Sequence, residues 1–537
     1  MDKNIKQAIV KGETSLGIEF GSTRIKAVLI DRSFEIIASG SYEWENQLID
    51  GYWTYDLDKM INGLQKSYHQ LNQEIERKYG IKLQKIGSIG CSAMMQGYIA
   101  LDQAGELLVP FRTWRNSTTG TAATELTEKF RFKIPQRWSI SHLYQAILNG
   151  EAHVNEIAYV TTLSGYVHLR LTGNKALGMG DASGMFPIDG SANQYNESML
   201  KQFADLIADK DYPWDLSAIL PKVYTAGDHA GYLNEAGARL LDPSGNLQAG
   251  IPLCPPEGDG GTGMVATNSV RKSTGNISVG TSIFAMIVLN KELSKVYPEI
   301  DIMNTPDGSP VGLVLANNCS SDINAWLSLF REFHEAMGMK PDMNQIFSIL
   351  FNKALEADAD GGGLLSYGYY SGENITGFAK GRPLFVRSPE SRFDLANFMR
   401  MNLFSAFAVL RLGMDILTQK EQVTIDRILA HGGLFKTPLV GQKMCAAALN
   451  VPVSVMSTAG EGGAWGMAIL ASFMVNKAQH EGLADYLTTK VFNDMEGQEV
   501  YPDSADVDGF ALFMERYIKG LAIEQAAVDH FSENWKK

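Results

Sequence analysis

The stretch SLGIEFGSTRIKAVLID, residues 15–31, decides the fold class of this chain. Two apolar runs, residues 15–20 and 25–31, flank the small turn Gly21-Ser22-Thr23. Apolar runs joined by a short Gly/Ser turn are typical of a β-hairpin. We therefore expect a strand, a tight turn and a second strand, rather than a strand that leads into a helix.

The same pattern recurs 259 residues later as NISVGTSIFAMIVL, where Gly280 and Thr281 take the places of Gly21 and Ser22. Such a recurrence indicates a duplicated domain, in which the N–H groups and hydroxyls of two turns face the oxygens of a phosphate chain. The alternative is a chance match between two short hairpins. The first copy carries charged side chains, among them Glu19 and Lys26. We therefore expect the first hairpin, rather than the second, to supply the charged groups for catalysis.

Composition and charge restrict the class of protein. A chain of 537 residues with 45% hydrophobic residues exceeds what one core usually organises, so two domains are expected. A net charge of -13 argues against binding to nucleic acid or to an anionic membrane.

The four cysteines are far apart in the sequence, which favours neither disulfides nor a zinc site. The longest apolar stretch, residues 462–475, is shorter than the roughly 18 residues of a membrane span. We expect a soluble, cytoplasmic protein.

Strand and helix signals alternate along the chain. Asp58 is suited to cap a helix whose apolar face ends at Gly80, and an apolar strand follows at residues 85–93. This alternation predicts an α/β fold, with helices covering a sheet. Near the C-terminus, residues 507–531 have the pattern of an amphipathic helix.

A glycine-rich segment, residues 258–263, reads GDGGTG and formally matches a dinucleotide-binding fingerprint. The charge of Asp259 inside the turn would oppose a pyrophosphate, and the next acidic residue, Glu292, is too distant for the usual ribose ligand. Glycine neighbours instead leave Asp259 open to a hydroxyl-bearing substrate, as a general base requires. The alternative is a helix-capping aspartate, and the two roles are compatible.

A third glycine site follows an apolar strand at Gly432-Gly433. Thr437 and Pro438 are suited to be the N-cap and first residue of a helix that Asn450 ends, before a strand at residues 451–456. Glycines at this turn would let a flat base lie on the backbone. A turn required only by packing is the alternative that these residues leave open.

Taken in order, these motifs resemble the FGGY carbohydrate kinase family, and the xylulokinases within it, over about residues 15–517. The segments that carry the resemblance are the two hairpins together with CSAMMQG (91–97), LSGYVHLRLTG (163–173), GDASGMFPID (180–189), GDGGTGMVATN (258–268), HGGLFKTPLVGQKM (431–444) and EGGAWGMAILA (461–471). The resemblance implies an α/β protein of two actin-like ATPase (ribonuclease H-like) domains that flank a catalytic cleft. Residues 1–270 would form the sugar-binding domain, and residues 271–537 the nucleotide-binding domain with its helical tail.

The resemblance also assigns roles to residues. Asp259 would be the general base that accepts the proton of the attacking sugar hydroxyl. The remaining assignments are ATP binding by Gly21, Ser22, Thr23, Lys26, Gly280, Thr281, Gly432, Gly433 and Thr437, sugar binding by Met95, Gln96 and Trp114 beside Asp259, and Mg²⁺ binding by Glu19. The implied reaction is ATP-dependent phosphorylation of a ketopentose such as xylulose. Alternatives are ribulose, another ketose, a polyol such as glycerol or erythritol, or a non-kinase role as an actin-like ATPase or sugar-sensing regulator. A homodimer is also consistent with the resemblance.

The sequence departs from the family pattern at three places. Glu19 stands where the family usually has aspartate, and Gln96 stands where many xylulokinases have histidine. The segment TWRNSTTG, residues 113–120, replaces a tryptophan segment that usually ends in an aspartate and an arginine. These departures bear on the metal and on the identity of the sugar more than on the type of reaction.

Overall fold

The computed structural model describes residues 2–340, 342–455, 462–493 and 497–531. The chain forms two compact units, each described by itself below. The first unit comprises Met1–Val270, Asp301–Val311 and Glu461–Asp494. The second comprises Arg271–Ile300, Gly312–Gly460 and Met495–Lys537. The division into domains of 1–270 and 271–537 stays a prediction from the sequence, and the compact units of the structure group 301–311 and 461–494 with the first unit.

The first unit is a mixed α/β unit. Its strands are β1 (Ser15–Phe20), β2 (Arg24–Ile30), β3 (Ile36–Glu43), β4 (Gln47–Ile49), β5 (Tyr52–Thr54), β6 (Ser88–Ala93), β7 (Ile99–Leu101), β8 (Tyr159–Thr161), β9 (Ala176–Gly178), β10 (Ile188–Asp189), β11 (Gln194–Tyr195), β12 (Lys222–Tyr224), β13 (Gly231–Tyr232), β14 (Pro252–Leu253) and β15 (Glu257–Gly258). Its helices are α1 (Asp2–Lys11), α2 (Leu57–Tyr79), α3 (Gly120–Phe130), α4 (Ser139–Leu148), α5 (Leu163–Thr172), α6 (Met179–Ala182), α7 (Glu197–Leu206), α8 (Leu216–Ile219), α9 (Glu235–Leu241), α10 (Asp259–Ala266), α15 (Gly462–Asn476) and α16 (Leu483–Tyr486).

The predicted hairpin forms the centre of the first sheet, whose order is β13-β14-β6-β1-β2-β3. β1 pairs with β2 in antiparallel fashion, from Ser15 opposite Ile30 to Phe20 opposite Ile25. On its other side β1 runs parallel to β6, and β15 also pairs with β6 at the end nearest the turn. This arrangement brings the ends of β1, β6 and β15 to one edge of the sheet.

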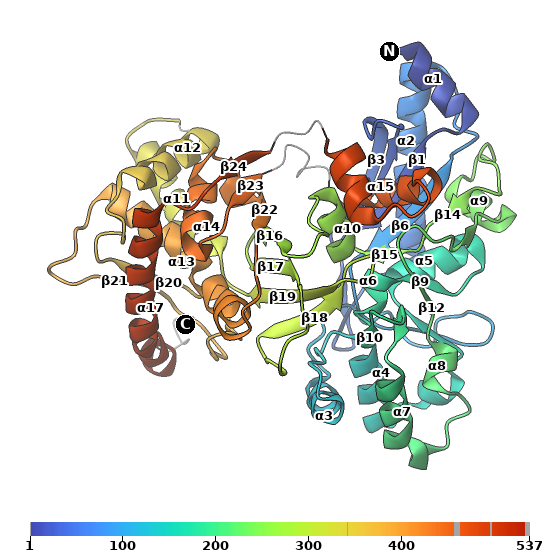
Figure 1. Cartoon of the computed structure of the whole chain (residues 1–537), viewed down its shortest axis with the longest axis horizontal. Helices are drawn as coiled ribbons and strands as arrows, with labels where there is room; N and C mark the ends of the chain where they lie inside the picture. The colour runs from blue at the N-terminus through green and yellow to red at the C-terminus, as the bar shows by residue number, and fades with distance from the viewer. Residues whose placement is uncertain (1, 341, 456–461, 494–496, 532–537) are drawn as a thin grey trace. The chain divides into compact units, whose positions relative to one another are not determined.

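Helices α2 and α15 cover opposite faces of this sheet (Figure 1). A Cβ atom on Gly40 of β3 would lie 2.0 Å from the Ser67 carbonyl oxygen of α2. A Cβ atom on Gly17 of β1 would lie 2.0 Å from the Ala464 carbonyl oxygen of α15. Both helices therefore approach the sheet at backbone distance, which only glycine permits. This packing is why 461–494 belongs to the first unit.

Helix α2 confirms the predicted helix but corrects its cap. Asp56, not Asp58, is the N-cap, and its carboxylate accepts hydrogen bonds from the N–H groups of Asp58 and Lys59. Asp58 lies in the first turn, where its charge favours the positive end of the helix dipole. The predicted end at Gly80 is confirmed, since this residue has φ +66° and caps the helix.

The second unit repeats the topology of the first. Its strands are β16 (Thr274–Val279), β17 (Ile283–Val288), β20 (Leu365–Gly368), β21 (Pro383–Val386), β22 (Arg427–Gly432), β23 (Val453–Val455) and β24 (Gln498–Val500), and its helices are α11 (Ser320–Ala336), α12 (Met343–Lys353), α13 (Leu395–Asp415), α14 (Val440–Leu449) and α17 (Ser504–His530). Two further strands of the second sheet, β18 (Ile300–Asn304) and β19 (Pro310–Ala316), include residues that are grouped with the first unit, since that grouping takes in 301–311. The order β3-β2-β1-β6-β14 in the first sheet corresponds to β19-β17-β16-β22-β23 in the second. As in the first copy, the hairpin partner is antiparallel and the next two strands are parallel. The recurrence in the sequence is therefore a recurrence of topology.

Helix α14 begins later than predicted. Thr437 and Pro438 lie in the turn before the helix, which begins at Val440. Leu439 has φ +68°, a left-handed conformation that prevents residues 437–438 from belonging to the helix. The predicted end at Asn450 is confirmed by its left-handed cap. The strand predicted at 451–456 is β23, and Met456 lies outside the described residues.

Two long helices organise the second unit. α13 continues as a π-helix (Ile416–Lys420), and residues 395–420 are long and apolar enough to cross a membrane, but 72% of that window is buried inside the protein, as in a core helix. The sequence does not show this helix as one long apolar stretch, because polar side chains such as Asn402 and Arg411 interrupt it.

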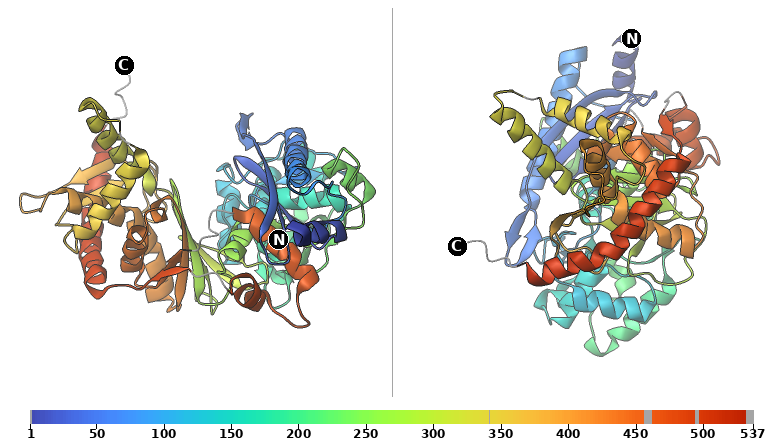
Figure 2. Two further views of the ribbon diagram at one scale, coloured as in Figure 1. Left: turned by 90° about the horizontal axis from the view of Figure 1, so that it is seen from above. Right: turned by 90° about the vertical axis from the view of Figure 1, so that its left-hand side faces the viewer.

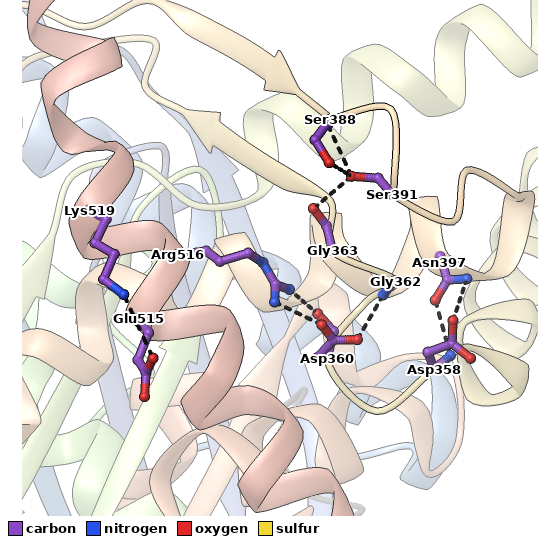
Figure 3. A network of polar contacts seen from close by, with 10 residues as sticks. All are labelled: Asp358, Asp360, Gly362, Gly363, Ser388, Ser391, Asn397, Glu515, Arg516 and Lys519. Atoms are coloured by element: carbon purple, nitrogen blue, oxygen red, sulfur yellow. Dashed lines mark hydrogen bonds and ion pairs between the residues drawn. The ribbon is translucent and has the colours of Figure 1, made fainter.

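The predicted C-terminal helix is confirmed as α17, the long red helix of Figure 2. Arg516 of α17 donates a hydrogen bond to Asp360 at 2.7 Å (Figure 3). In the same loop, Asp358 donates its N–H to the side chain of Asn397 of α13 at 3.0 Å. These contacts fix the loop 358–363 between the two helices.

Candidate active site

The second hairpin turn has its carbonyl groups fixed by the start of helix α11. The N–H of Cys319 donates to the Thr281 carbonyl at 2.9 Å, and the N–H and hydroxyl of Ser320 both donate to the Gly280 carbonyl. Because C=O and the following N–H point in opposite directions across a planar peptide, the N–H groups of this turn face away from α11. The turn is thus built to present donors, as a phosphate clamp requires.

Gly432 stands beside this turn at the end of β22, opposite Val279 of β16. It has φ +113°, and a Cβ atom would lie 2.0 Å from the Val279 carbonyl oxygen, so only glycine fits. Among the described residues no atom beyond its chain neighbours lies within 4 Å of a Cβ position on Gly433, which leaves its backbone open to a ligand on that side. The second unit therefore brings together three of the predicted nucleotide-binding glycines, Gly280, Gly432 and Gly433, while Thr437 is buried in the turn that follows them.

Asp259 is the first residue of α10, directly after β15. Its Oδ1 atom accepts hydrogen bonds from the N–H of Met95 at 3.2 Å and from the N–H of Gly260 at 2.9 Å. The Asp259 side chain is exposed to solvent on one side. Desolvation by the surrounding protein raises the pKa of its carboxyl, and the hydrogen bond from the Met95 N–H lowers it. The N-cap of α10 is Gly258 rather than Asp259, although the Asp259 carboxylate accepts the N–H of Gly260 within the first turn. The role of Asp259 as a general base stays a prediction.

The loop after β6 carries the predicted sugar-binding residues Met95 and Gln96. Gln96 is buried and has φ +70°, a conformation that a non-glycine residue adopts only where the surroundings enforce it. Met95 packs against Gly258, where a Cβ atom would lie 2.1 Å from the Met95 Cγ atom. Met95 therefore joins the predicted sugar loop to the predicted base in two ways. Its side chain contacts Gly258, and its backbone N–H donates to the Asp259 carboxylate.

Glu19 lies on β1 with its carboxylate at the start of α15. Burial raises its pKa to about 7, and the charge of Asp259 adds to this, while the N–H groups of Ala464 and Gly463 and the charge of Lys26 lower it. Two neighbouring carboxylates, Glu19 and Asp259, fit the oxygen ligands that Mg²⁺ takes when substrate phosphates and water complete its coordination. Within the described chain no group of three or more His, Cys, Asp or Glu side chains forms a metal cage.

Two buried carboxyls behind Asp259 were missed by the sequence analysis. Asp181 of α6 accepts hydrogen bonds from the hydroxyls of Thr162 and Ser164, at 2.7 and 2.5 Å. Its own N–H, and that of Gly180, donate to Glu257. Asp181 belongs to the segment GDASGMFPID, so the resemblance pointed to its neighbourhood, but nothing in the local sequence marked Glu257.

The stability of the protein should depend on pH through this pair. Burial, followed by the charge of Asp259, raises the pKa of Asp181 to about 7, and burial, followed by the charge of Asp181, raises that of Glu257 to about 8. A carboxyl whose pKa is raised on folding stabilises the fold below its unfolded pKa of about 4, and this stability is lost as the pH rises through the folded value. We expect wild-type Tm to fall between about pH 4 and pH 8.

The replacement Asp181→Asn should flatten this pH dependence, by on the order of 2 kcal/mol between pH 5 and pH 8. Thermal unfolding followed by circular dichroism across this range measures it. Asp242→Asn is the matched control, because Asp242 is also buried but accepts its hydrogen bonds from residues 244–247, away from Asp181. Parallel pH profiles for wild type and Asp181→Asn would contradict the prediction.

Residues 14–265 match the model of the N-terminal domain of the FGGY family of carbohydrate kinases, and residues 275–475 match the model of its C-terminal domain. The chain belongs to the FGGY family. It is therefore an ATP-dependent carbohydrate kinase, a phosphotransferase that acts on a sugar hydroxyl, and the predicted actin-like fold is confirmed. The alternatives of a non-kinase ATPase or a sugar-sensing regulator are not supported by this membership.

Several FGGY relatives cover almost the whole chain. A xylulose kinase from Haemophilus influenzae is 22% identical over 94% of this chain and 99% of its own length. Among solved structures, a ligand-bound xylulose kinase from Lactobacillus acidophilus has a TM-score of 0.78 at 17% identity, covering 96% of this chain and 99% of its own. A gluconate kinase from the same organism has a TM-score of 0.76 at 17% identity, covering 97% and 99%. The structural likenesses support the fold of this FGGY kinase and leave its sugar open.

Proposed function

We propose that this FGGY kinase phosphorylates a ketopentose such as xylulose, with Asp259 as the general base. The observation that carries the proposal is the hydrogen bond from the Met95 N–H to the Asp259 carboxylate, since it fixes the base on the sugar loop. One oxygen of Asp259 is held by two N–H groups, and the other is available for a proton. A carboxylate held in this way would keep one oxygen for the proton of the sugar hydroxyl, as general base catalysis requires.

The remaining roles are those that the resemblance to the FGGY family implies. Met95, Gln96 and Trp114 would bind the sugar, while Gly21, Ser22, Thr23 and Lys26 would contact the transferred phosphate. Gly280, Thr281, Gly432, Gly433 and Thr437 would bind the rest of ATP. Phosphoryl transfer needs mainly positioning and charge neutralisation, which donors fixed in advance supply. Mg²⁺ held through Glu19 would neutralise phosphate charge when bound. A cytoplasmic location and a homodimer stay predictions from the sequence.

The choice of a ketopentose is supported by the relatives named as xylulose kinases, at about 20% identity. Release of ADP from Mg-ATP, measured across D- and L-ketopentoses, ketohexoses, polyols and gluconate, tests it. We expect one ketopentose to stimulate ADP release far above the rate without sugar. Selective stimulation by a polyol, a ketohexose or gluconate would replace the proposed substrate, and no stimulation by any of them would refute it.

A further inference from the structure

The carbonyl groups of the first hairpin turn are all held by one segment of the first unit. The indole Nε1 of Trp44 donates to the Gly21 carbonyl at 2.7 Å, and the hydroxyl of Tyr55 donates to the Ser22 carbonyl at 2.7 Å. The N–H of Trp44 donates to the Thr23 carbonyl at 3.1 Å. Residues 44–55, which contain β4 and β5, are called the strap below.

These bonds determine where the N–H groups of the turn point. In a planar trans peptide the carbonyl of one residue and the N–H of the next point in opposite directions. Because the carbonyls of Gly21, Ser22 and Thr23 face the strap, the N–H groups of Ser22, Thr23 and Arg24 face away from it. Three successive N–H groups on one side of a turn are the arrangement that binds an anion. The strap thus sets the direction of the proposed phosphate donors.

The two donor side chains of the strap are themselves fixed by packing. The rings of Trp44 and Tyr55 lie with centroids 4.3 Å apart and planes inclined by 31°, and Phe111 packs next to Tyr55 with a centroid distance of 6.4 Å. Trp44 is 6% exposed and Tyr55 2% exposed. Buried rings packed against each other have little rotamer freedom. The Trp44 indole N–H and the Tyr55 hydroxyl therefore lose little further side-chain entropy when a ligand binds to the turn.

The strap also holds the segment that carries Trp114. The N–H of Trp53 in β5 donates to the Asn116 side chain at 2.7 Å, and the Asn116 amide donates back to the Trp53 carbonyl at 2.8 Å. The guanidinium of Arg115 lies 4.2 Å from the centroid of the Trp53 ring. On the other side of Trp114, the N–H of Thr113 also donates to the Trp53 carbonyl, at 3.1 Å. Residues on both sides of Trp114 are thus held by β5, while Trp114 itself is 41% exposed.

We propose that the strap is a positioning element shared by both substrates of this kinase. Trp44 and Tyr55 orient the turn Gly21-Ser22-Thr23 toward the phosphates, and Asn116 fixes Trp114 for the sugar. This inference rests on the proposed function and adds residues that do not themselves touch either substrate. It also gives a reason for the departure TWRNSTTG, since its asparagine forms the two hydrogen bonds to β5.

The variant Tyr55→Phe tests the nucleotide side. It keeps the ring packed beside Trp44 and removes the hydrogen bond to the Ser22 carbonyl, together with the longer one, at 3.5 Å, that the hydroxyl accepts from the Asn46 side chain. We expect the affinity for a non-hydrolysable ATP analogue, measured by calorimetry with Mg²⁺, to fall about fivefold, in line with the loss of one hydrogen bond. The affinity for adenosine and the KM for the sugar should stay within about twofold of wild type, because the turn faces only phosphate. Trp44→Phe should act in the same way through Gly21.

The matched control is Tyr68→Phe in the same unit, because the Tyr68 hydroxyl is buried with no hydrogen-bond partner among the described residues. Equal affinities for the ATP analogue in Tyr55→Phe and Tyr68→Phe would overturn the nucleotide half of the inference. An equal loss for adenosine and for the ATP analogue would also overturn it, because a general structural defect would then be the cause.

The variant Asn116→Ala tests the sugar side. It should raise the KM for the sugar about fivefold or more and leave the affinity for the ATP analogue within about twofold. An unchanged KM for the sugar would overturn this half. Failure of the proposed function gives a different result, because wild type would then show no ADP release with any sugar, while nucleotide affinity would still report on Tyr55. A wild type that binds no ATP analogue would overturn both the function and the inference.

Discussion

Asp259→Asn should lower the sugar-dependent turnover by roughly 10² to 10⁴, the usual range for the loss of a general base. Asparagine keeps an Oδ1 acceptor for the N–H groups of Met95 and Gly260, so the loop and the start of α10 should stay in place. Its Nδ2 group, however, cannot accept the proton of the sugar hydroxyl. We therefore expect the loss in kcat, while affinity for the ATP analogue and Tm remain near wild type.

Steady-state ADP release with the best sugar of the panel measures this effect. Asp102→Asn is a suitable control, because Asp102 likewise accepts two backbone N–H groups through Oδ1, from Ala104 and Glu106, in an exposed loop. Turnover near the wild-type value in Asp259→Asn would remove Asp259 from the chemistry. A comparable loss in Asp102→Asn would show that the assay reports damage to the fold instead.

Gly17→Ala should strongly destabilise the first unit. The added Cβ atom would lie 2.0 Å from the Ala464 carbonyl oxygen and 2.4 Å from the Ala468 nitrogen, and both are backbone atoms of α15. Backbone cannot move aside as the end of a side chain can, so β1 and α15 must separate. We expect a loss of about 3 kcal/mol or more in the free energy of unfolding, at the upper end of overpacking effects.

Thermal and urea unfolding measure the loss, with Gly263→Ala as the control. Gly263 lies within α10, and in the described part of the chain no atom outside the helix's own backbone lies within 4 Å of its Cβ position, so alanine should be neutral or slightly stabilising there. Similar unfolding midpoints for Gly17→Ala and wild type would mean that α15 does not pack on β1 at backbone distance. The grouping of 461–494 with the first unit would then need another cause.

The sequence-based predictions are confirmed where interactions between residues close in the chain decide the structure. The two hairpins, the end of α2 at Gly80 and the end of α14 at Asn450 depend on residues within a few positions of one another. The cap of α2 was misplaced by two residues, because Asp56 and Asp58 are equally suited by type and only the backbone of Asp56 is extended. Thr437 and Pro438 were misread for a similar reason, since the left-handed Leu439 separates them from α14.

The α/β class, each of the two hairpins and the position of Asp259 among glycines could be predicted from the amino-acid sequence, because each depends on a pattern of neighbouring residues. Three-dimensional packing alone shows that α15 lies on β1, that Asp181 and Glu257 are buried near Asp259, and that Trp44 and Tyr55 bond the turn Gly21-Ser22-Thr23. Each of these contacts joins residues from separate elements, and most of the partners are far apart in the sequence. Their energies come from close packing and from burial of polar groups, which no local pattern encodes.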